Sequence, residues 1–230
     1  MNTELLLASQ SPRRRELIGL LGFPFNSMSA DVDESILPDE DPAEYVVRLA
    51  EAKARACCDQ PSPPALSQRE REPVVVIGSD TAVVFAGVIL GKPKDASDAQ
   101  SMLRQLRGRT HQVYTAVALY DPESDQVVTE LSITDVPMRE YSDAELEAYV
   151  QTGDPLDKAG GYAIQNDEFH PVENFNGCYA SVMGLPLCHL TRSLTNMGLK
   201  PETDVPARCQ ATLAYDCPIY PTILRNKNLE

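Results

Sequence analysis

The sequence predicts an α/β fold in which helices flank a mixed, twisted sheet. Short apolar runs alternate with segments whose apolar residues recur at helical spacing, and this alternation is typical of α/β proteins. One run, Val74 to Ile77, is apolar and entirely β-branched, which indicates a strand buried on both faces. Two further strands are expected at 111–120 and 126–135, joined by a turn-rich segment.

The first expected helix begins with a feature suited to anions. A short apolar strand at residues 5–8 leads to Ser11, a good N-cap, and Gly22 can end the helix. Free backbone N–H groups and the positive end of the helix dipole would lie where Arg13 and Arg14 stand. The start of this helix therefore suits a phosphate chain.

The other expected elements follow in order along the chain. They begin with a strand at 25–29, a helix at 42–58 capped by Asp41, a loop at 60–72 and a hairpin that turns at 86–87. The next helix is opened by a capping box of Ser97 and Gln100 and ends at Leu106, and another runs from the capping box of Ser142 and Glu145 to about residue 152. A last helix is expected at 186–197. From residue 199 to 230, prolines and weak periodicity predict an irregular extension.

Composition narrows the class of protein. The 230 residues are 43% hydrophobic and 23% charged, which is ordinary for a soluble globular protein. A net charge of −14 argues against sequence-independent nucleic-acid binding, which relies on many Lys and Arg contacts to phosphates. The apolar runs are too short to cross a bilayer and no signal peptide is expected, so we expect a cytoplasmic protein. The six scattered cysteines show no metal-ligand spacing and are expected to be free thiols.

Asp80 is the carboxylate that the sequence singles out first. It is expected just beyond the carboxyl end of the 74–77 strand, where open α/β sheets bind ligands. Gly78 and Ser79 would let other groups approach closely. The same three residues also favour turns, so a plain turn remains an equal alternative from local sequence.

Three lysines stand in settings that fit either a site or the surface. Lys92 lies in a stiff Gly-Lys-Pro segment, Lys158 precedes a double glycine, and Lys53 lies on the second expected helix. Each one, taken alone, fits a solvated surface charge better than a site.

Glu34 and Asp80 together suit Mg²⁺ or Mn²⁺, although clustered loop acids are more often solvent-exposed.

Seven short motifs in a fixed order resemble one family. They are Ser9-Gln10-Ser11-Pro12-Arg13-Arg14, Asp33-Glu34, Lys53, Ser79-Asp80-Thr81, Gly91-Lys92-Pro93, Asp157-Lys158-Ala159-Gly160 and Gly184-Leu185-Pro186-Leu187. This ordered set, over about residues 4 to 198, is similar to the Maf family and is far more specific than any single motif. The resemblance implies a Maf/ITPase-like domain over residues 1–198, elongated and two-lobed around a central cleft.

The resemblance also implies roles for individual residues. Asp80 is expected to be the catalytic acid–base residue, and Glu34 and Asp80 to hold a divalent metal. Positions linked to substrate choice are matched by Arg13, Thr81 and Gln165. Phosphate-binding positions of the family's cleft are matched by Ser9, Arg13, Arg14, Lys53, Lys92 and Lys158. The residues 166–170 replace the glycine-rich continuation expected after Gln165.

Family members hydrolyse nucleoside triphosphates to the monophosphate and pyrophosphate with a divalent metal, and many form homodimers. The segment from Asp157 to Gln165 resembles the branch that acts on dTTP and UTP. Two alternatives remain open at this point, a pyrophosphatase for other or modified triphosphates and a nucleotide-binding regulator without turnover. Nucleic acid and membranes are not expected as partners.

Overall fold

The computed structural model describes residues 4–58 and 74–225 and confirms the mixed α/β architecture. The expected loop at 60–72 lies outside the described residues. The strands are β1 (Glu4–Leu7), β2 (Phe25–Ser27), β3 (Val74–Phe85), β4 (Val88–Leu90), β5 (Thr110–Asp121) and β6 (Gln126–Pro137). Their order across the sheet is β2-β1-β3-β5-β6, with β4 paired to β3. β1 pairs parallel with β2 and with β3. β5 pairs antiparallel with both of its neighbours, β3 and β6.

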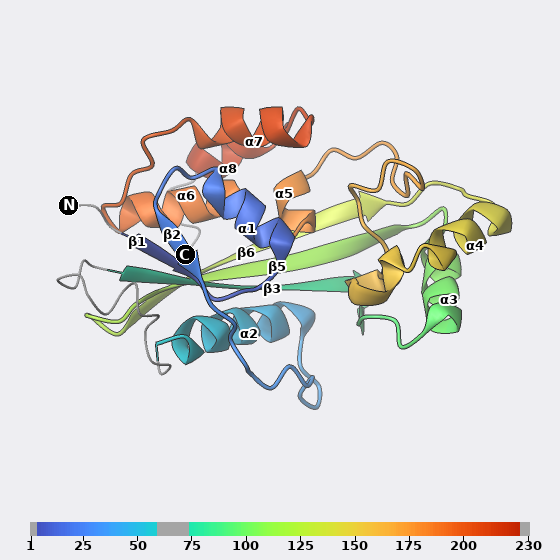
Figure 1. Ribbon diagram of the computed structural model, residues 1–230, viewed down its shortest axis with the longest axis horizontal. Coiled ribbons are helices and arrows are strands. Elements are labelled where there is room, and N and C mark those ends of the chain that lie inside the picture. Colours follow the sequence, from blue (N-terminus) through green and yellow to red (C-terminus); the bar gives the residue numbers. More distant parts are fainter. Residues whose placement is uncertain (1–3, 59–73, 226–230) are drawn as a thin grey trace.

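Helices cover both faces of this sheet (Figure 1). They are α1 (Pro12–Gly19), α2 (Pro42–Ala56), α3 (Ala96–Leu106), α4 (Asp143–Gln151), α5 (Tyr179–Val182), α6 (Leu187–Asn196), α7 (Val205–Leu213) and α8 (Tyr220–Arg225), with the short 3₁₀ turns η1 (Asp154–Asp157) and η2 (Ala159–Gly161). Figure 1 shows α2 on one face and α1, α5 and α6 on the other, while α3 and α4 lie together at one end of an elongated molecule.

The long strands β3 and β5 connect two lobes. Alternate residues of β3 pack on opposite faces, so Ile77 joins the core beneath α1 and α6, and Val76 joins the core beneath α2. Further along the same strand, Val83 belongs to a third core built with α3 and α4. The expected two-lobed arrangement therefore rests on two strands of 12 residues that run through both lobes.

β3 differs from the expected strand because it does not end at Ile77. It continues to Phe85, and nine consecutive residues pair with β5, including Asp80 with Ala116. Gly78 is therefore not part of a turn. A Cβ at Gly78 would lie 2.0 Å from the carbonyl oxygen of Ala50, so the glycine instead allows α2 to pack directly on the strand.

Three of the four expected helix caps are confirmed, among them Asp41, whose carboxylate accepts from the backbone N–H of Ala43, and the fourth is wrong. The Ser11 side chain accepts from the backbone N–H of Arg14, and Ser142 with Glu145 forms a complete capping box. For α3 the N-cap is Asp95, whose carboxylate accepts from the N–H of residue 98, and the expected cap Ser97 lies inside the helix. Asp95 is an equally good capping residue two positions earlier, and local sequence does not separate the two.

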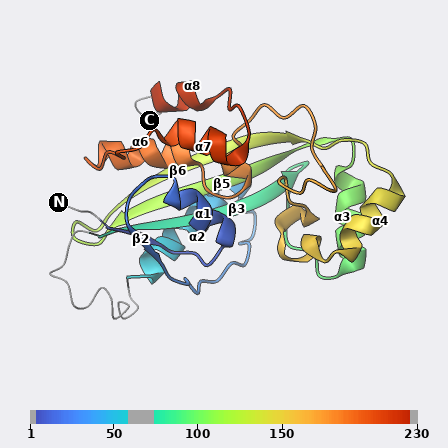
Figure 2. The same ribbon diagram turned by 45° about the horizontal axis from the view of Figure 1, so that its top comes forward.

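The extension after residue 198, expected to be irregular, contains two helices within its described residues, 199–225. Val205, Cys209 and Leu213 recur at intervals of four and pack against the core beneath α6, and Asp204 caps α7. The Arg192 side chain donates to the Ile223 carbonyl oxygen at 2.9 Å and thereby links α6 to α8. Figure 2 shows α7 and α8 lying over α6.

Two expectations about the chain as a whole can be compared with the structure. None of the helices within residues 4–58 and 74–225 is long and apolar enough to cross a membrane. None of the six cysteines, all of which lie within the described residues, forms a disulfide bond.

Candidate active site

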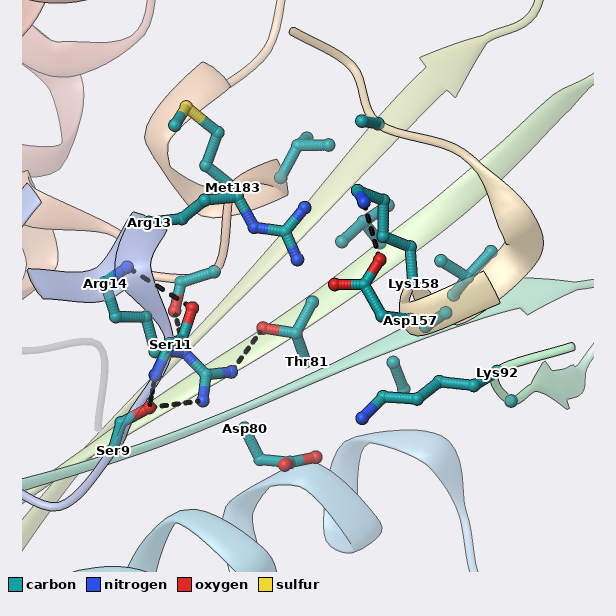
Figure 3. A pocket seen from close by; sticks show the side chains of 18 of the residues that line it. Ser9, Ser11, Arg13, Arg14, Asp80, Thr81, Lys92, Asp157, Lys158 and Met183 are labelled. Atoms are coloured by element: carbon teal, nitrogen blue, oxygen red, sulfur yellow. Dashed lines mark hydrogen bonds and ion pairs between the residues drawn. The ribbon is translucent and has the colours of Figure 1, made fainter. Parts of the chain in front are cut away.

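A cleft of about 890 Å³ opens beside the middle of β3 (Figure 3). The pairing of β3 with β1 ends at Ile77 and its pairing with β4 begins at Val83, so Asp80 and Thr81 stand on the edge between these two pairings. The site thus lies at the carboxyl end of parallel β1, although not at the end of β3 itself. The residues expected at the site that line this cleft are Ser9, Arg13, Arg14, Glu34, Lys53, Asp80, Thr81, Lys92, Lys158 and Gln165.

Lys53 connects the two carboxylates at the cleft floor. Its Nζ lies 2.7 Å from Asp80 Oδ1 and 2.6 Å from Glu34 Oε1. The side chains of Lys53 and Asp80 are each only 10% exposed, whereas that of Glu34 is 55% exposed. The reading of Lys53 as a solvated charge is therefore wrong, because α2 packs so closely on β3 that the lysine is buried between them.

Helix α2 also positions Glu34. The hydroxyl of Tyr45 donates to the Glu34 carbonyl oxygen at 3.1 Å, and Arg48 Nη2 donates to the Ser35 carbonyl oxygen at 3.0 Å. Arg48 also pairs with Glu40 at 2.5 Å. The loop before α2 is thus tied to the same helix that delivers Lys53, so both carboxylates are fixed relative to one cation.

The surroundings shift the pKa values of the two carboxyl groups in opposite directions. Burial raises the pKa of Asp80, and the positive charges of Lys53 and Arg14 counter this only in part. Burial also acts to raise the pKa of Glu34, but the hydrogen bond and charge of Lys53 outweigh it, with Lys92 contributing, and the net pKa is lowered. Asp80 is thereby the better proton acceptor of the two.

Arg14 joins α1 to the edge of β3. Its Nη2 donates to Thr81 Oγ1 at 3.1 Å, its Nε donates to the Gly184 carbonyl oxygen at 2.9 Å, and its Nη1 lies 3.5 Å from Ser9 Oγ. Burial lowers the pKa of Arg14, and a guanidinium in such a position still remains charged. Ser79, which sequence reasoning treated as a small neighbour, donates to the same Gly184 carbonyl at 2.9 Å.

Two further cations point into the open part of the cleft. Figure 3 shows the Arg13 guanidinium reaching from α1 toward Asp157, and the Lys92 ammonium reaching toward Asp80 from the segment after β4. Among the described residues, five cations thus line the cleft, beside four carboxylates, in a chain whose net charge is −14. Such focusing attracts a small polyanion while the rest of the surface repels large ones.

Lys158 is already paired with two carboxylates that sequence reasoning did not single out. Its Nζ lies 2.9 Å from Asp154 Oδ1 and 2.6 Å from Asp157 Oδ1, and it also donates to the Asp154 carbonyl oxygen. Both aspartates line the cleft. The sequence signal was their position within the segment that includes Lys158, but acidic residues beside a lysine are common on surfaces.

Gln165 lies in the cleft with a buried, unsatisfied atom. Within the described residues, its Oε1 is buried and accepts no hydrogen bond. A buried acceptor without a partner carries a desolvation cost that a ligand donor would remove. Apolar side chains nearby in the cleft, among them Ile164 and Val182, suit a flat ring.

The carboxylates at the cleft floor supply oxygen ligands of the kind that a divalent cation prefers. Glu34 and Asp80 supply carboxylate oxygens close enough to share one ammonium, and hard divalent ions prefer oxygen ligands. In the described part of the chain, no group of three or more His, Cys, Asp or Glu side chains is arranged to hold a metal. Mg²⁺ often uses one or two carboxylates with substrate phosphates and water, so the pair fits that mode.

Comparisons with known proteins show which family the chain is similar to. A sequence model of the family described as "Maf-like protein" matches residues 4–197. A dTTP/UTP pyrophosphatase of Hahella chejuensis is 46% identical, over 87% of this chain and 95% of that protein. Similar proteins of the same name from Geotalea uraniireducens and Pseudoalteromonas atlantica are 43% and 44% identical, over 85% and 86% of this chain and 96% and 99% of theirs.

Among solved structures, the Ham1 protein of Staphylococcus aureus shares 16% identity with a TM-score of 0.36, over 59% of this chain and 71% of that one. The sequence matches are much more extensive, because they include β1, β3 and every cleft residue named above. With relatives 43% to 46% identical over nearly their whole length, the chain belongs to the Maf family.

Proposed function

We propose that this protein is a nucleoside triphosphate pyrophosphatase that hydrolyses dTTP and UTP to the monophosphate and pyrophosphate. The observation that carries the proposal is the buried Asp80, held by Lys53 in a cleft where cations from α1, α2 and the segment after β4 converge. A binding module for triphosphates needs the cations, but it does not need a buried carboxylate among them. The relatives described above bear the name dTTP/UTP pyrophosphatase, which supports the substrate class.

The proposed reaction is an in-line displacement at the α-phosphorus. Asp80 accepts a proton from water, the water oxygen bonds to the α-phosphorus, and the bond to the bridging oxygen breaks as pyrophosphate leaves. Arg13, Lys92 and Lys158 are proposed to neutralise the charge that develops on the phosphates, whereas Arg14 and Ser9 set the position of Thr81 and the α1 terminus. Positioned donors of this kind are typically worth ~10²–10³ in rate each.

Glu34 and Asp80 are the residues proposed to hold a divalent metal, Mg²⁺ or Mn²⁺. When bound, the metal would polarise a phosphoryl oxygen and offset the charge of the triphosphate. If Asp80 contacts the metal directly, its pKa falls and its strength as a base decreases, so the two roles compete. A titration of activity against each ion after chelation with EDTA tests the requirement, and full activity in EDTA would contradict it.

The base is proposed to be read by Gln165. Uracil and thymine present an N–H between two carbonyls, and an amide side chain can accept from that N–H and donate to a carbonyl. The buried, unsatisfied Oε1 of Gln165 is the acceptor this pairing requires. Cytosine has an unprotonated nitrogen at the same position, so it would leave that acceptor unpaired.

A panel of nucleoside triphosphates tests the function. We expect pyrophosphate release from dTTP and UTP to exceed that from CTP, ATP and GTP, and hydrolysis in ¹⁸O-labelled water to place the label in the monophosphate. Preference for a purine or modified triphosphate would replace the proposed substrate. Tight triphosphate binding without hydrolysis in Mg²⁺ or Mn²⁺ would replace the enzyme with a nucleotide-binding regulator. A homodimer and a cytoplasmic location stay predictions.

A further inference from the structure

One carboxylate, that of Asp154, contacts side chains from three different segments around the cleft. It accepts a hydrogen bond from the Tyr149 hydroxyl at 2.7 Å and one from Asn166 Nδ2 at 3.3 Å, both on Oδ2. Its other oxygen lies 2.9 Å from Lys158 Nζ. Asp154 therefore ties the end of α4 and the segment after η2 to a cation of the cleft.

The same contacts fix the segment that carries Gln165. The Tyr149 hydroxyl, which donates to Asp154, also accepts from the backbone N–H of Ala163 at 3.0 Å. Asn166, which donates to Asp154, donates its own backbone N–H to the Ala163 carbonyl oxygen at 3.1 Å. Gln165 thus stands between Ala163, which is linked to the Asp154 carboxylate through Tyr149, and Asn166, which contacts it directly.

Packing makes this anchor stiff. The Tyr149 ring stacks on Phe169 with centroids 4.2 Å apart and planes 9° from parallel, and both rings are nearly fully buried. The Phe169 backbone N–H donates to Asn166 Oδ1 at 2.8 Å. Because the Tyr149 ring stacks on Phe169 and its hydroxyl is hydrogen-bonded, the tyrosine moves little and restricts movement of the 163–166 segment.

Asp157 differs from Asp154 although both pair with Lys158. The Asp157 side chain is 75% exposed and that of Asp154 is 31% exposed. Exposed ion pairs contribute little, so Lys158 can leave Asp157 for a phosphate at small cost. Asp154 in contrast keeps Lys158 in place from the protein side.

We propose that Asp154 is a positioning residue that couples base reading to phosphate placement, holding Gln165 through Tyr149 and Asn166 and holding Lys158 directly. This inference rests on the proposed function, because it assigns Gln165 to the base and Lys158 to the phosphates. Asp154 itself acts through those residues. A shift of the anchored segment by about 1 Å can reduce turnover about 10²-fold, so loss of the anchor is measurable.

The test compares Asp154→Asn and Tyr149→Phe with a matched control, Asp143→Asn. Asp143 is an aspartate of α4, the helix that carries Tyr149; its side chain is 61% exposed, it pairs with Arg107, and it does not line the cleft. For each protein, kcat and KM are measured for UTP and CTP, and the affinity of a non-hydrolysable UTP analogue and its CTP counterpart is measured by calorimetry. Thermal unfolding is recorded in parallel.

We expect Asp154→Asn to reduce the preference for UTP over CTP by about tenfold or more and to raise the KM for UTP. Tyr149→Phe, which removes only a hydroxyl, should change the preference in the same direction, and Asp143→Asn should match the wild type. Unchanged preference in a folded Asp154→Asn protein overturns the proposal. If Asp154→Asn does not fold, Tyr149→Phe decides by the same criterion.

A double-mutant cycle with Gln165→Ala separates positioning from general destabilisation. If Asp154 acts through Gln165, Asp154→Asn should change base preference much less in the Gln165→Ala background than in the wild type. If Asp154→Asn changes the preference for UTP over CTP by the same factor in both backgrounds, Asp154 does not act through Gln165. A loss of stability alone would lower the unfolding temperature without this non-additivity.

The measured affinities for the UTP and CTP analogues distinguish a failure of this inference from a failure of the proposed function. If the wild type hydrolyses UTP and Asp154→Asn keeps the wild-type preference, the positioning role fails and the function stands. If the wild type hydrolyses no triphosphate but Asp154→Asn lowers the preference in analogue binding, the function fails and the positioning role stands. If the wild type does not bind the analogues, both fail.

Discussion

Gly78→Ala is a small change that should disturb both the fold and the cleft. A Cβ at this position would lie 2.0 Å from the Ala50 carbonyl oxygen and 2.8 Å from the Ala54 backbone nitrogen, both in α2. Neither atom belongs to a flexible side chain that could move aside. The helix must therefore recede from β3 by roughly 1 Å, because interiors are close-packed and non-bonded atoms do not approach so closely.

The displacement reaches the site because Lys53 lies one turn after Ala50 on the same helix. Its contact of 2.7 Å to Asp80 on β3 would lengthen by a similar amount and pass the usual limit for a good hydrogen bond, whereas Glu34, whose loop is tied to α2, would move with the helix. Overpacking of a core typically costs about 1–3 kcal/mol. Loss of alignment of a reacting group by about 1 Å can cost about 10² in rate.

Chemical denaturation gives the free energy of unfolding, and pyrophosphate release from UTP gives the rate. The matched control is Gly19→Ala at the end of α1, where a Cβ would meet Phe25 at 3.8 Å, an ordinary contact. Removing that glycine should leave stability unchanged or raise it by about 0.5–1 kcal/mol. If Gly78→Ala retains the stability and the rate of the wild type, the close packing of α2 on β3 does not position Lys53.

Three other changes test separate parts of the site and the fold. Lys53→Met removes the cation between Asp80 and Glu34 and should lower kcat for UTP by ~10²–10³, and a smaller loss than tenfold would contradict its role. Gln165→Ala should lower the preference for UTP and dTTP over CTP more than it lowers overall turnover, and an unchanged preference would move base reading elsewhere. Burial lowers the pKa of His111 to about 4, so between pH 6.5 and 4 the unfolded chain binds a proton that the folded protein does not. The free energy of unfolding should therefore fall by roughly 3 kcal/mol as the pH drops through that window. Burial lowers the pKa of His189 to about 4 as well, so His111→Phe should reduce the slope of the stability curve in this window without removing it, and an unchanged slope measured by denaturation at each pH would refute the explanation.

The cleft residues could be found in the sequence because they occur in short motifs whose order is specific, although each motif alone is ambiguous. What sequence could not supply is the contact between segments far apart. Lys53 resembles a surface lysine beside Glu51 and Arg55, and its burial depends on Gly78, 25 positions later in the chain. Likewise Asp80 resembles a turn residue, because the pairing of β3 with β5 that keeps it inside a strand is not visible locally.

The remaining differences have equally physical causes. Asp95 and Ser97 are comparable caps, and in the structure the Asp95 carboxylate makes the capping hydrogen bond, to the N–H of residue 98, so the helix begins two residues earlier than expected. The spacing of Val205, Cys209 and Leu213 predicts a helix, but the prolines around it obscured the pattern. Asp154 carried only one sequence signal, its position four residues before Lys158, because its role arises from three partners that meet only in the folded chain.

The most direct test of the central claim is single-turnover hydrolysis of UTP by Asp80→Asn, compared with the wild type in the same metal. The substitution keeps the shape of the side chain and removes its ability to accept the proton from water. We predict that the variant still binds the triphosphate and that the rate of pyrophosphate release falls by about 10²–10⁴, the usual contribution of a general base, while the cations of the cleft keep theirs. Pyrophosphate release at a substantial fraction of the wild-type rate would show that the buried carboxylate is not the group that activates water.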